Sequence, residues 1–431
     1  MRKGVTTMRR HTWPRWCISG LATALVICPA IIGSAQGAGP QTTEPIKIGV
    51  IGEESSVAGG SITRAALLAA DDINAHGGVN GRRSQVITYD DHSSAAEGVR
   101  AFQRAVSDDK VVAVIGSYIS EVVLAIEPWS GRLHMPFITP GAASTEISKR
   151  VHDDYEHYKY TFEGWLTAPF QAQSICDFSH DILVNQLHLK TTVVMSEDAA
   201  WTTPLDARYL ECLPKAGLEV LDHVRFNPDT TDFTPIFNQI ERKHPNIVMT
   251  GMAHVGVQPT VQWHDQQVPF PMAGINIQAS TTAFWKDTHG ATEGVITFNS
   301  AAPGVASTPT TQTFAENYTK RYGDSPAYSG YTSYDMVHVI AEAIKRAGST
   351  DPDKLVDALE KTDYVGTIGR EQFYGRDNAF THAMKYGPGL VTGVHLQWQN
   401  GKQVAVWPPD VARGKLVFPA FTKPALNATT K

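Results

Sequence analysis

The stretch IKIGVI, Ile46–Ile51, begins a regular alternation of apolar strand patterns and amphipathic helix patterns. Helical spacing follows over residues 61–75, where small and apolar residues recur on one face until two glycines end the pattern. Strand patterns return at 85–89 and 111–115, and each is followed by another helix pattern. Strands and helices in strict turn predict βαβ units and therefore a parallel sheet.

A second alternation of the same kind runs from residue 170 to residue 267 and begins with a helix pattern over 170–187. Helix patterns follow over 311–322, 330–347 and 352–361, and two strand patterns, 391–398 and 403–407, flank the turn Asn400-Gly401. The sequence therefore predicts two similar α/β units with a cleft between them. Ligands of open parallel sheets bind beyond the carboxyl ends of the strands, against helix N-termini, so the site is expected in the strand-to-helix turns.

The N-terminal segment has the parts of a secretory signal peptide, which we place at residues 1–37. Residues 1–16 carry basic but no acidic side chains, an apolar run covers 17–32, and small residues follow. A membrane anchor is the alternative, but the run contains Pro29 and is shorter than the ~20 residues that a span needs. We expect a soluble periplasmic protein after cleavage near residues 35–38.

Only Cys176 and Cys212 follow this segment. In an oxidising compartment they either form a disulfide or remain two buried thiols, and the sequence leaves both alternatives open.

Composition and motifs exclude several function classes. Hydrophobic residues make up 42% and charged residues 19%, which is typical of a folded globular protein, and a net charge of −6 argues against general nucleic-acid binding. The phosphate-loop, dinucleotide, zinc-protease and nucleophile-elbow motifs are absent. The polar cluster His152–His157 reads as a solvated connector rather than a metal site. We therefore expect no cofactor, no metal and no catalytic residue.

Several stretches, in order along the chain, carry a family resemblance. They are IKIGV at 46–50, DDINAHGGVNGR at 71–82, VVAVIG at 111–116 and PFITPGA at 136–142, with Thr231-Asp232-Phe233 and Tyr334-Asp335 as later landmarks. Over roughly residues 46–408 the chain resembles the periplasmic substrate-binding proteins of branched-chain amino acid (Leu/Ile/Val-type) ABC transporters, of the type I periplasmic binding protein family.

The resemblance implies an α/β fold with two Rossmann-like lobes, each with a parallel sheet, joined by a three-segment hinge as in a Venus flytrap. We place lobe 1 at 45–162 and 299–381, lobe 2 at 163–298 and 382–420, and a C-terminal tail at 421–431. Such a protein closes on a small ligand, an amino acid or a related carboxylate or amide, and delivers it to a membrane permease. A monomer is the default.

Two other functions are compatible with the same patterns. A sensor would pass its ligand state to a membrane receptor instead of a permease. An exported α/β enzyme would need a nucleophile beside a base, and Ser120 with a nearby His would be the candidate pair. No His lies close to Ser120 in the sequence.

The resemblance also implies binding residues in the first lobe. Ser120 matches the serine whose hydroxyl, with backbone N–H groups, holds the ligand's carboxylate, and its position also predicts an N-cap for a helix over 121–132. In the next turn the carbonyl of Gly141 would help to hold an α-ammonium. Further first-lobe candidates are Ala142, Ala143 (where the family has Thr), its neighbour Ser144, Tyr118, and Ser61 in place of an aromatic residue.

The second lobe departs from the family at its charged positions. Trp201 stands where an aromatic residue covers the ligand, and Met252 takes the place of a second aromatic residue. Asn276 replaces the acidic partner of the α-ammonium, and Glu163 replaces a common Arg. A neutral amide cannot offset a buried ammonium charge. We therefore expect a small carboxylate with an apolar or aromatic body, or an amide facing Asn276, rather than a standard amino acid.

Overall fold

The computed structural model describes residues 44–427, so the predicted signal peptide lies outside the described residues. Within this range, no helix combines the length and the apolar character that crossing a bilayer requires.

The first lobe is built on a five-stranded sheet of order β2-β1-β3-β4-β5, in which all neighbours pair in parallel. Its inner strands are buried on both faces, which explains why their sequences are apolar runs rather than alternating patterns. The strands are β1 (Ile46–Ile51), β2 (Ser84–Tyr89), β3 (Ala113–Gly116), β4 (Phe137–Thr139) and β5 (Thr161–Glu163). The helices between them are α1 (Val57–Ala75), α2 (Ala95–Ser107), α3 (Ser120–Arg132), α4 (Thr145–Asp153) and α5 (Tyr155–Tyr158).

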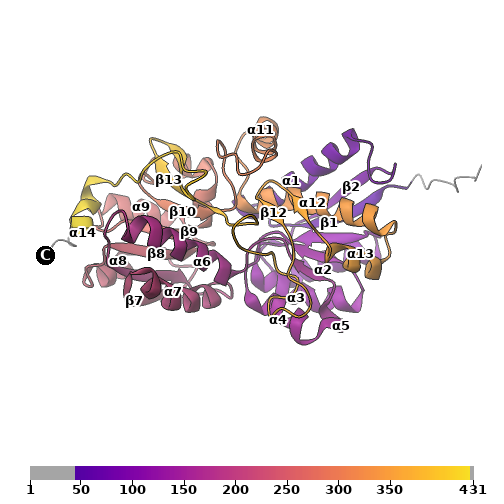
Figure 1. Cartoon of the computed structure of the whole chain (residues 1–431), viewed down its shortest axis with the longest axis horizontal. Helices are drawn as coiled ribbons and strands as arrows, with labels where there is room; N and C mark the ends of the chain where they lie inside the picture. Colours follow the sequence, from indigo (N-terminus) through magenta and orange to yellow (C-terminus); the bar gives the residue numbers. More distant parts are fainter. Residues whose placement is uncertain (1–43, 428–431) are drawn as a thin grey trace, which may run out of the picture. The chain divides into compact units, whose positions relative to one another are not determined.

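Three later helices complete this lobe from distant sequence: α11 (Thr311–Tyr322), α12 (Tyr328–Ala347) and α13 (Pro352–Leu359). Helix α12 lies beside α1 (Figure 1), and the hydroxyl of Ser333 donates to the carbonyl of Ile62 at 2.9 Å. The hydroxyl of Tyr160 reaches Asp353 on α13 at 2.7 Å. The small residues on one face of α1 are buried, which lets the two long helices pack closely.

The second lobe holds a parallel sheet of order β7-β6-β8-β9. Its strands are β6 (Thr191–Glu197), β7 (Glu219–Phe226), β8 (Ile247–Met252) and β9 (Met272–Asn276). Its helices are α6 (Ala168–Phe178), which continues as a π-helical turn over Ser179–Val184, α7 (Thr202–Ala216), α8 (Thr234–Glu241), α9 (Val257–Asp265) and α10 (Ala283–Asp287), with a 3-10 turn at Ile277–Ser280.

An antiparallel sheet, β10-β13-β14, continues this lobe beyond β9. It consists of β10 (Ile296–Asn299), β13 (Val394–Gln399) and β14 (Lys402–Trp407), and Thr297 and Asn276 exchange hydrogen bonds of 3.0 and 3.1 Å. A 3-10 turn (Ala420–Thr422) and α14 (Lys423–Asn427) pack on the same lobe, where Phe421 contacts Trp263. A separate pair of short strands, β11 (Tyr364–Val365) and β12 (Arg370–Glu371), lies after α13.

The chain passes between the lobes after β5, after β10 and before β13. The first and third passages run side by side, because the N–H of Glu163 donates to the carbonyl of His382 at 3.0 Å and Glu163 bridges Ala383. Glu163 is buried there, and this burial raises the pKa of its carboxyl group well above the usual value. The predicted fold class, two Rossmann-like lobes with parallel sheets, is confirmed.

One local expectation was wrong in part, one agrees with the structure and one open question is answered. The predicted helix from residue 170 to 187 is helical as far as Val184, but α6 gives way to a π-helical turn after Phe178. Residues 152–157 are mostly exposed, as expected of a solvated polar connector, and they join the end of α4 to α5 through Asp154. Cys176 of α6 and Cys212 of α7 form a disulfide, with their Cα atoms 6.0 Å apart.

Candidate functional site

A cavity lies between the lobes, at the carboxyl ends of both parallel sheets, where the sequence placed it. The lobes touch beside it, since the N–H of Ala200 donates to Oε1 of Glu121 at 2.8 Å. The first lobe contributes Tyr118, Ile119, Ser120, Gly141, Ala143 and Tyr328 to the lining, and the second contributes Gln171, Trp201, Ala253, His254 and Ile277. An outer mouth shares Tyr118, Ala253, His254 and Ile277 and adds, among others, Glu53, Ser56, Gln278 and Asp287.

Ser120 lines this cavity but is not an N-cap. Ile119 occupies the cap position in an extended conformation without a capping side chain, and Ser120 is the first residue of α3. Its hydroxyl instead accepts the N–H groups of Ala143 and Ser144, both at 3.3 Å. A hydroxyl that accepts two hydrogen bonds still has its own hydrogen to donate. Ser120 can therefore donate to an anion at the N-terminus of α3, where the helix dipole also favours negative charge.

The turn after β4 is fixed by Thr139 and leaves little space. The hydroxyl of Thr139 accepts the N–H groups of Gly141 and Ala142, at 3.4 and 3.0 Å. The carbonyl of Gly141, expected to hold an α-ammonium, already accepts the hydroxyl of Tyr328 at 3.0 Å. A Cβ atom at Gly141 would lie 2.8 Å from both Tyr118 Cβ and Tyr328 Oη, so only glycine fits without displacement.

Four other predicted residues do not line the cavity. Ala142 is buried beneath it, and Ser144 caps α4 by accepting the N–H of Glu146 at 3.4 Å. Ser61 lies inside the first lobe, where its hydroxyl accepts the N–H of Ala327 at 3.0 Å. Met252 packs in the apolar core of the second lobe. In each case packing or a hydrogen bond to the backbone keeps the side chain out of the cavity lining, and motif position alone does not show this.

Asn276 also fails to reach the cavity. Its Oδ1 accepts the N–H of Ala279 at 3.3 Å, and its Nδ2 donates to the carbonyl of Gly256 at 3.4 Å. The side chain therefore ties β9 to two neighbouring turns and is 1% exposed. Asn276 is therefore not among the residues that line this cavity, and its contact with a ligand stays a prediction.

Trp201 lines the cavity as predicted. Its indole ring is held by the buried carboxylate of Glu197, which was not among the predicted residues. The indole Nε1 donates to Glu197 Oε1 at 3.0 Å. The same carboxylate accepts Nδ1 of His254 at 2.7 Å and the N–H groups of Ala253 and His254 at 2.9 and 3.0 Å. The hydrogen bond to Glu197 is the largest cause of a raised pKa of His254, which burial partly opposes.

The sequence contained a signal for this pair. Glu197 ends β6 and His254 follows β8, and these strands are neighbours in the sheet. The carboxyl ends of adjacent parallel strands meet at one edge, so an acid and a His after them are expected to lie close together. The other lining residues that were missed are Ile119, Gln171, Ala253, Ile277 and Tyr328.

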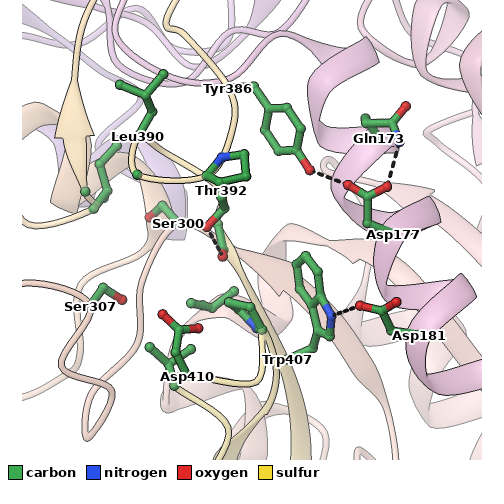
Figure 2. A pocket seen from close by; sticks show the side chains of 18 of the residues that line it. Gln173, Asp177, Asp181, Ser300, Ser307, Tyr386, Leu390, Thr392, Trp407 and Asp410 are labelled. Carbon is green, nitrogen blue, oxygen red and sulfur yellow. Dashed lines mark hydrogen bonds between the residues drawn. The ribbon is translucent and has the colours of Figure 1, made fainter. Parts of the chain in front are cut away.

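A larger cavity of about 1040 Å³ lies near the passages between the lobes, and both cysteines of the disulfide belong to its lining. Figure 2 shows this cavity from close by. Two of its acidic groups, Asp177 and Asp181, are engaged locally. Asp177 accepts the side-chain N–H of Gln173 and the hydroxyl of Tyr386, both at 2.7 Å, and Asp181 accepts the indole N–H of Trp407 at 3.0 Å. These bonds fasten α6 to the third passage and its π-helical continuation to β14. Among residues 44–427 no cluster of His, Cys, Asp and Glu has the geometry of a metal site.

Comparisons with known proteins agree with this architecture. The family model described as "Periplasmic binding protein" matches residues 45–387. The Leu/Ile/Val-binding protein homolog 8 of Brucella melitensis is 24% identical over 393 residues, covering 86% of this chain and 90% of the relative.

Solved structures have the same fold. The branched-chain amino acid transporter substrate-binding protein LivJ of Streptococcus pneumoniae, in complex with isoleucine, has a TM-score of 0.72 at 22% identity, covering 84% of this chain and 98% of LivJ. A solute-binding protein of an ABC transporter from R. palustris, in complex with benzoate, has a TM-score of 0.68 at 16% identity, covering 84% and 96%. With the family model matching most of the sequence, the chain belongs to the periplasmic binding protein family.

Proposed function

We propose that the protein is the extracytoplasmic solute-binding component of an ABC importer, which captures a small carboxylate between its lobes and delivers it to a membrane permease. The observation that carries the proposal is the cavity itself, which both lobes line at the carboxyl ends of their sheets. Ligand binding shifts such a pair of lobes towards the closed form, and the permease recognises that form.

The proposal includes the organisation inferred from the sequence. Lobe 1 comprises 45–162 and 299–381, lobe 2 comprises 163–298 and 382–420, and the three passages between them act as the hinge. The chain works as a soluble periplasmic monomer after loss of its signal peptide. The ligand is released unchanged, which mass spectrometry of recovered ligand can check.

The ligand is held at two ends. Ser120 and the N-terminus of α3 take the carboxylate, and Trp201 and Tyr118 flank an apolar or aromatic body. Relatives give general support, since isoleucine and benzoate, bound in two structures of this fold, are both carboxylates with apolar bodies.

Calorimetric titration and thermal shift with the mature chain test the proposal, using leucine, isoleucine, valine, benzoate, 4-hydroxybenzoate and benzamide. At least one carboxylate should bind with micromolar affinity, about −8 kcal/mol, and raise the melting temperature. Ser120→Ala should weaken that binding about tenfold or more, because a hydrogen bond to a charged group is lost. Ser349→Ala, in the loop after α12, is the matched control. Absence of binding across the panel, or equal affinity in Ser120→Ala, would contradict the proposal.

A further inference from the structure

Glu197 is a buried carboxylate whose hydrogen-bonding capacity is already used. It ends β6 and is fully buried. Oε1 accepts the Trp201 indole and His254 Nδ1, and Oε2 accepts the N–H groups of Ala253 and His254. The indole and backbone N–H groups can only donate, so the carboxyl group acts as an ionised acceptor on both oxygens. With four donors around it, Glu197 offers no free oxygen to a ligand.

His254 lies between this carboxylate and the cleft. Its Nδ1 faces Glu197, so the ring edge carrying Nε2 is turned away from Glu197, and the residue lines both the inner cavity and the mouth. An ionised partner 2.7 Å away stabilises the imidazolium, which carries a proton on Nε2 as well. The side chain is 29% exposed and can be reached by a ligand.

Other acidic groups lie near His254 but do not line the inner cavity. Glu53 and Glu121 of the first lobe add smaller electrostatic contributions that favour the imidazolium, and Glu53 and Asp287 line the mouth. Glu53 accepts the hydroxyl of Tyr118 at 2.9 Å, and Glu121 accepts the N–H of Ala200. Both carboxylates therefore already accept hydrogen bonds from the protein.

The inner cavity has no carboxylate to balance a ligand cation. No Asp or Glu is among its lining residues in the described part of the chain. The carbonyl of Gly141 already accepts one hydrogen bond, from Tyr328, and Asn276 is turned away. A buried ammonium group would face the His254 imidazolium without a counter-charge, which is costly. A carboxylate would instead meet donors from both lobes, Ser120 on one side and His254 on the other.

We propose that His254, positioned by Glu197, supplies a second-lobe cation that makes the cavity select carboxylates without an α-amino group. The inference rests on the proposed function, because it concerns the same cavity, and it names the class of ligand: a monocarboxylate with an apolar or aromatic body.

Matched ligand pairs test this selectivity by calorimetry near neutral pH. The pairs are leucine against 4-methylpentanoate and phenylalanine against 3-phenylpropanoate, which differ only by the amino group. The wild-type chain should bind the acid without the amino group at least about tenfold more tightly in one pair or both. His254→Gln, neutral but still polar, should remove most of this preference, whereas His264→Gln, an exposed substitution on α9, should preserve it.

The pH profile gives a readout that a purely structural role of His254 would not change. Wild-type affinity for the preferred acid should fall about tenfold from about pH 6 to about pH 9, as the imidazolium loses its proton. The affinity of His254→Gln should not change with pH. If that variant fails to fold, the pH dependence of wild-type affinity is the test by itself.

The failures of the two proposals can be told apart. Micromolar leucine binding that depends on Ser120 would overturn the selectivity proposal and leave the importer function intact. An unchanged ligand preference in His254→Gln would also overturn the selectivity proposal and leave the importer function intact. Failure of every panel member to bind would overturn both proposals.

Discussion

At the scale of single residues, the site depends on specific side chains and also on a glycine, where neighbouring residues occupy the space of a side chain. Glu197 and His254 show the first case, because one buried carboxylate orients two cavity residues. Gly141 shows the second, since Tyr118 and Tyr328 both pack against its Cα.

Gly141→Ala should therefore disturb the first-lobe side of the cavity. The added methyl group would lie 2.8 Å from Tyr118 Cβ and from the hydroxyl of Tyr328, so the Tyr118 main chain and the Tyr328 ring must shift. We expect a loss of about 1–3 kcal/mol in the free energy of unfolding, together with weaker ligand binding. Urea denaturation and calorimetry measure the two effects. Gly375→Ala is the control, because that position has no atom within 4 Å of the new Cβ.

A buried acid pair gives a second prediction at this scale. Asp335 on α12 accepts the N–H and hydroxyl of Thr367, and Glu371 lies buried beside it. Burial raises the pKa of Asp335 to about 6 and the pKa of Glu371 well above its usual value. A raised folded-state pKa means that the folded protein binds more protons than the unfolded chain, so stability falls as pH rises through that pKa.

Glu371→Gln should remove part of the loss of stability at rising pH, because the neutral amide has nearly the same volume as the carboxyl group. Relative to wild type, the variant should gain about 1–3 kcal/mol of unfolding free energy towards about pH 8 and no such gain near about pH 4. Urea midpoints across this range provide the measurement. Glu342→Gln, at an exposed ion pair on α12, should follow the wild-type curve within about 0.5 kcal/mol. Parallel curves for wild type and Glu371→Gln would disprove the interpretation.

At the scale of elements, periodicity predicted most helices and strands but not how they end. The helix over 311–322 was predicted with its observed bounds, because its burial pattern and terminal Gly323 follow local rules. The predicted helix over 170–187 is α-helical only to Phe178, because its second half widens into a π-helical turn that ends at Val184.

The difference between local patterns and long-range packing also explains which residues of the site were predicted. Tyr118, Ser120, Gly141, Ala143 and Trp201 line the cavity as expected, since each lies in a strand-to-helix turn that the alternation locates. Others depend on contacts between segments far apart in sequence, such as Tyr328 with Gly141, 187 residues away, and periodicity carries no information about such contacts.

The disulfide between α6 and α7 can be tested at this scale. It closes a segment of 36 residues, so removing it with Cys176→Ala/Cys212→Ala should lower the free energy of unfolding by about 2–4 kcal/mol. Wild-type protein with a reducing agent should denature at the same urea concentration as the double variant. Ligand affinity should stay close to the wild-type value, since neither cysteine lines the inner cavity. A reducing agent without effect would show that the bond does not form.

At the scale of the whole molecule, binding depends on contact between the lobes as well as on each lobe. The hydrogen bond from Ala200 to Glu121 joins α3 to the segment before α7 next to the cavity. It forms only when the lobes meet, so it favours the closed form.

Glu121→Ala should therefore weaken ligand binding without unfolding either lobe. We expect about a twofold to tenfold increase in Kd, because one hydrogen bond to a carboxylate at an exposed position is lost. Glu121→Gln retains an acceptor oxygen and should recover part of the affinity. Calorimetry gives the affinities, and an unchanged melting temperature without ligand serves as the control. Equal affinity of Glu121→Ala and wild type would show that this contact does not support closure.

The pairing of α1 with α12 has a consequence for biogenesis. The bond from Ser333 to Ile62 joins residues 271 positions apart, so the apolar face of α1 stays uncovered until the ribosome has made more than three quarters of the polypeptide. Until then the N-terminal half lacks the helix that completes its core. A nascent chain of this design can complete the core of its first lobe only once α12 has been synthesised.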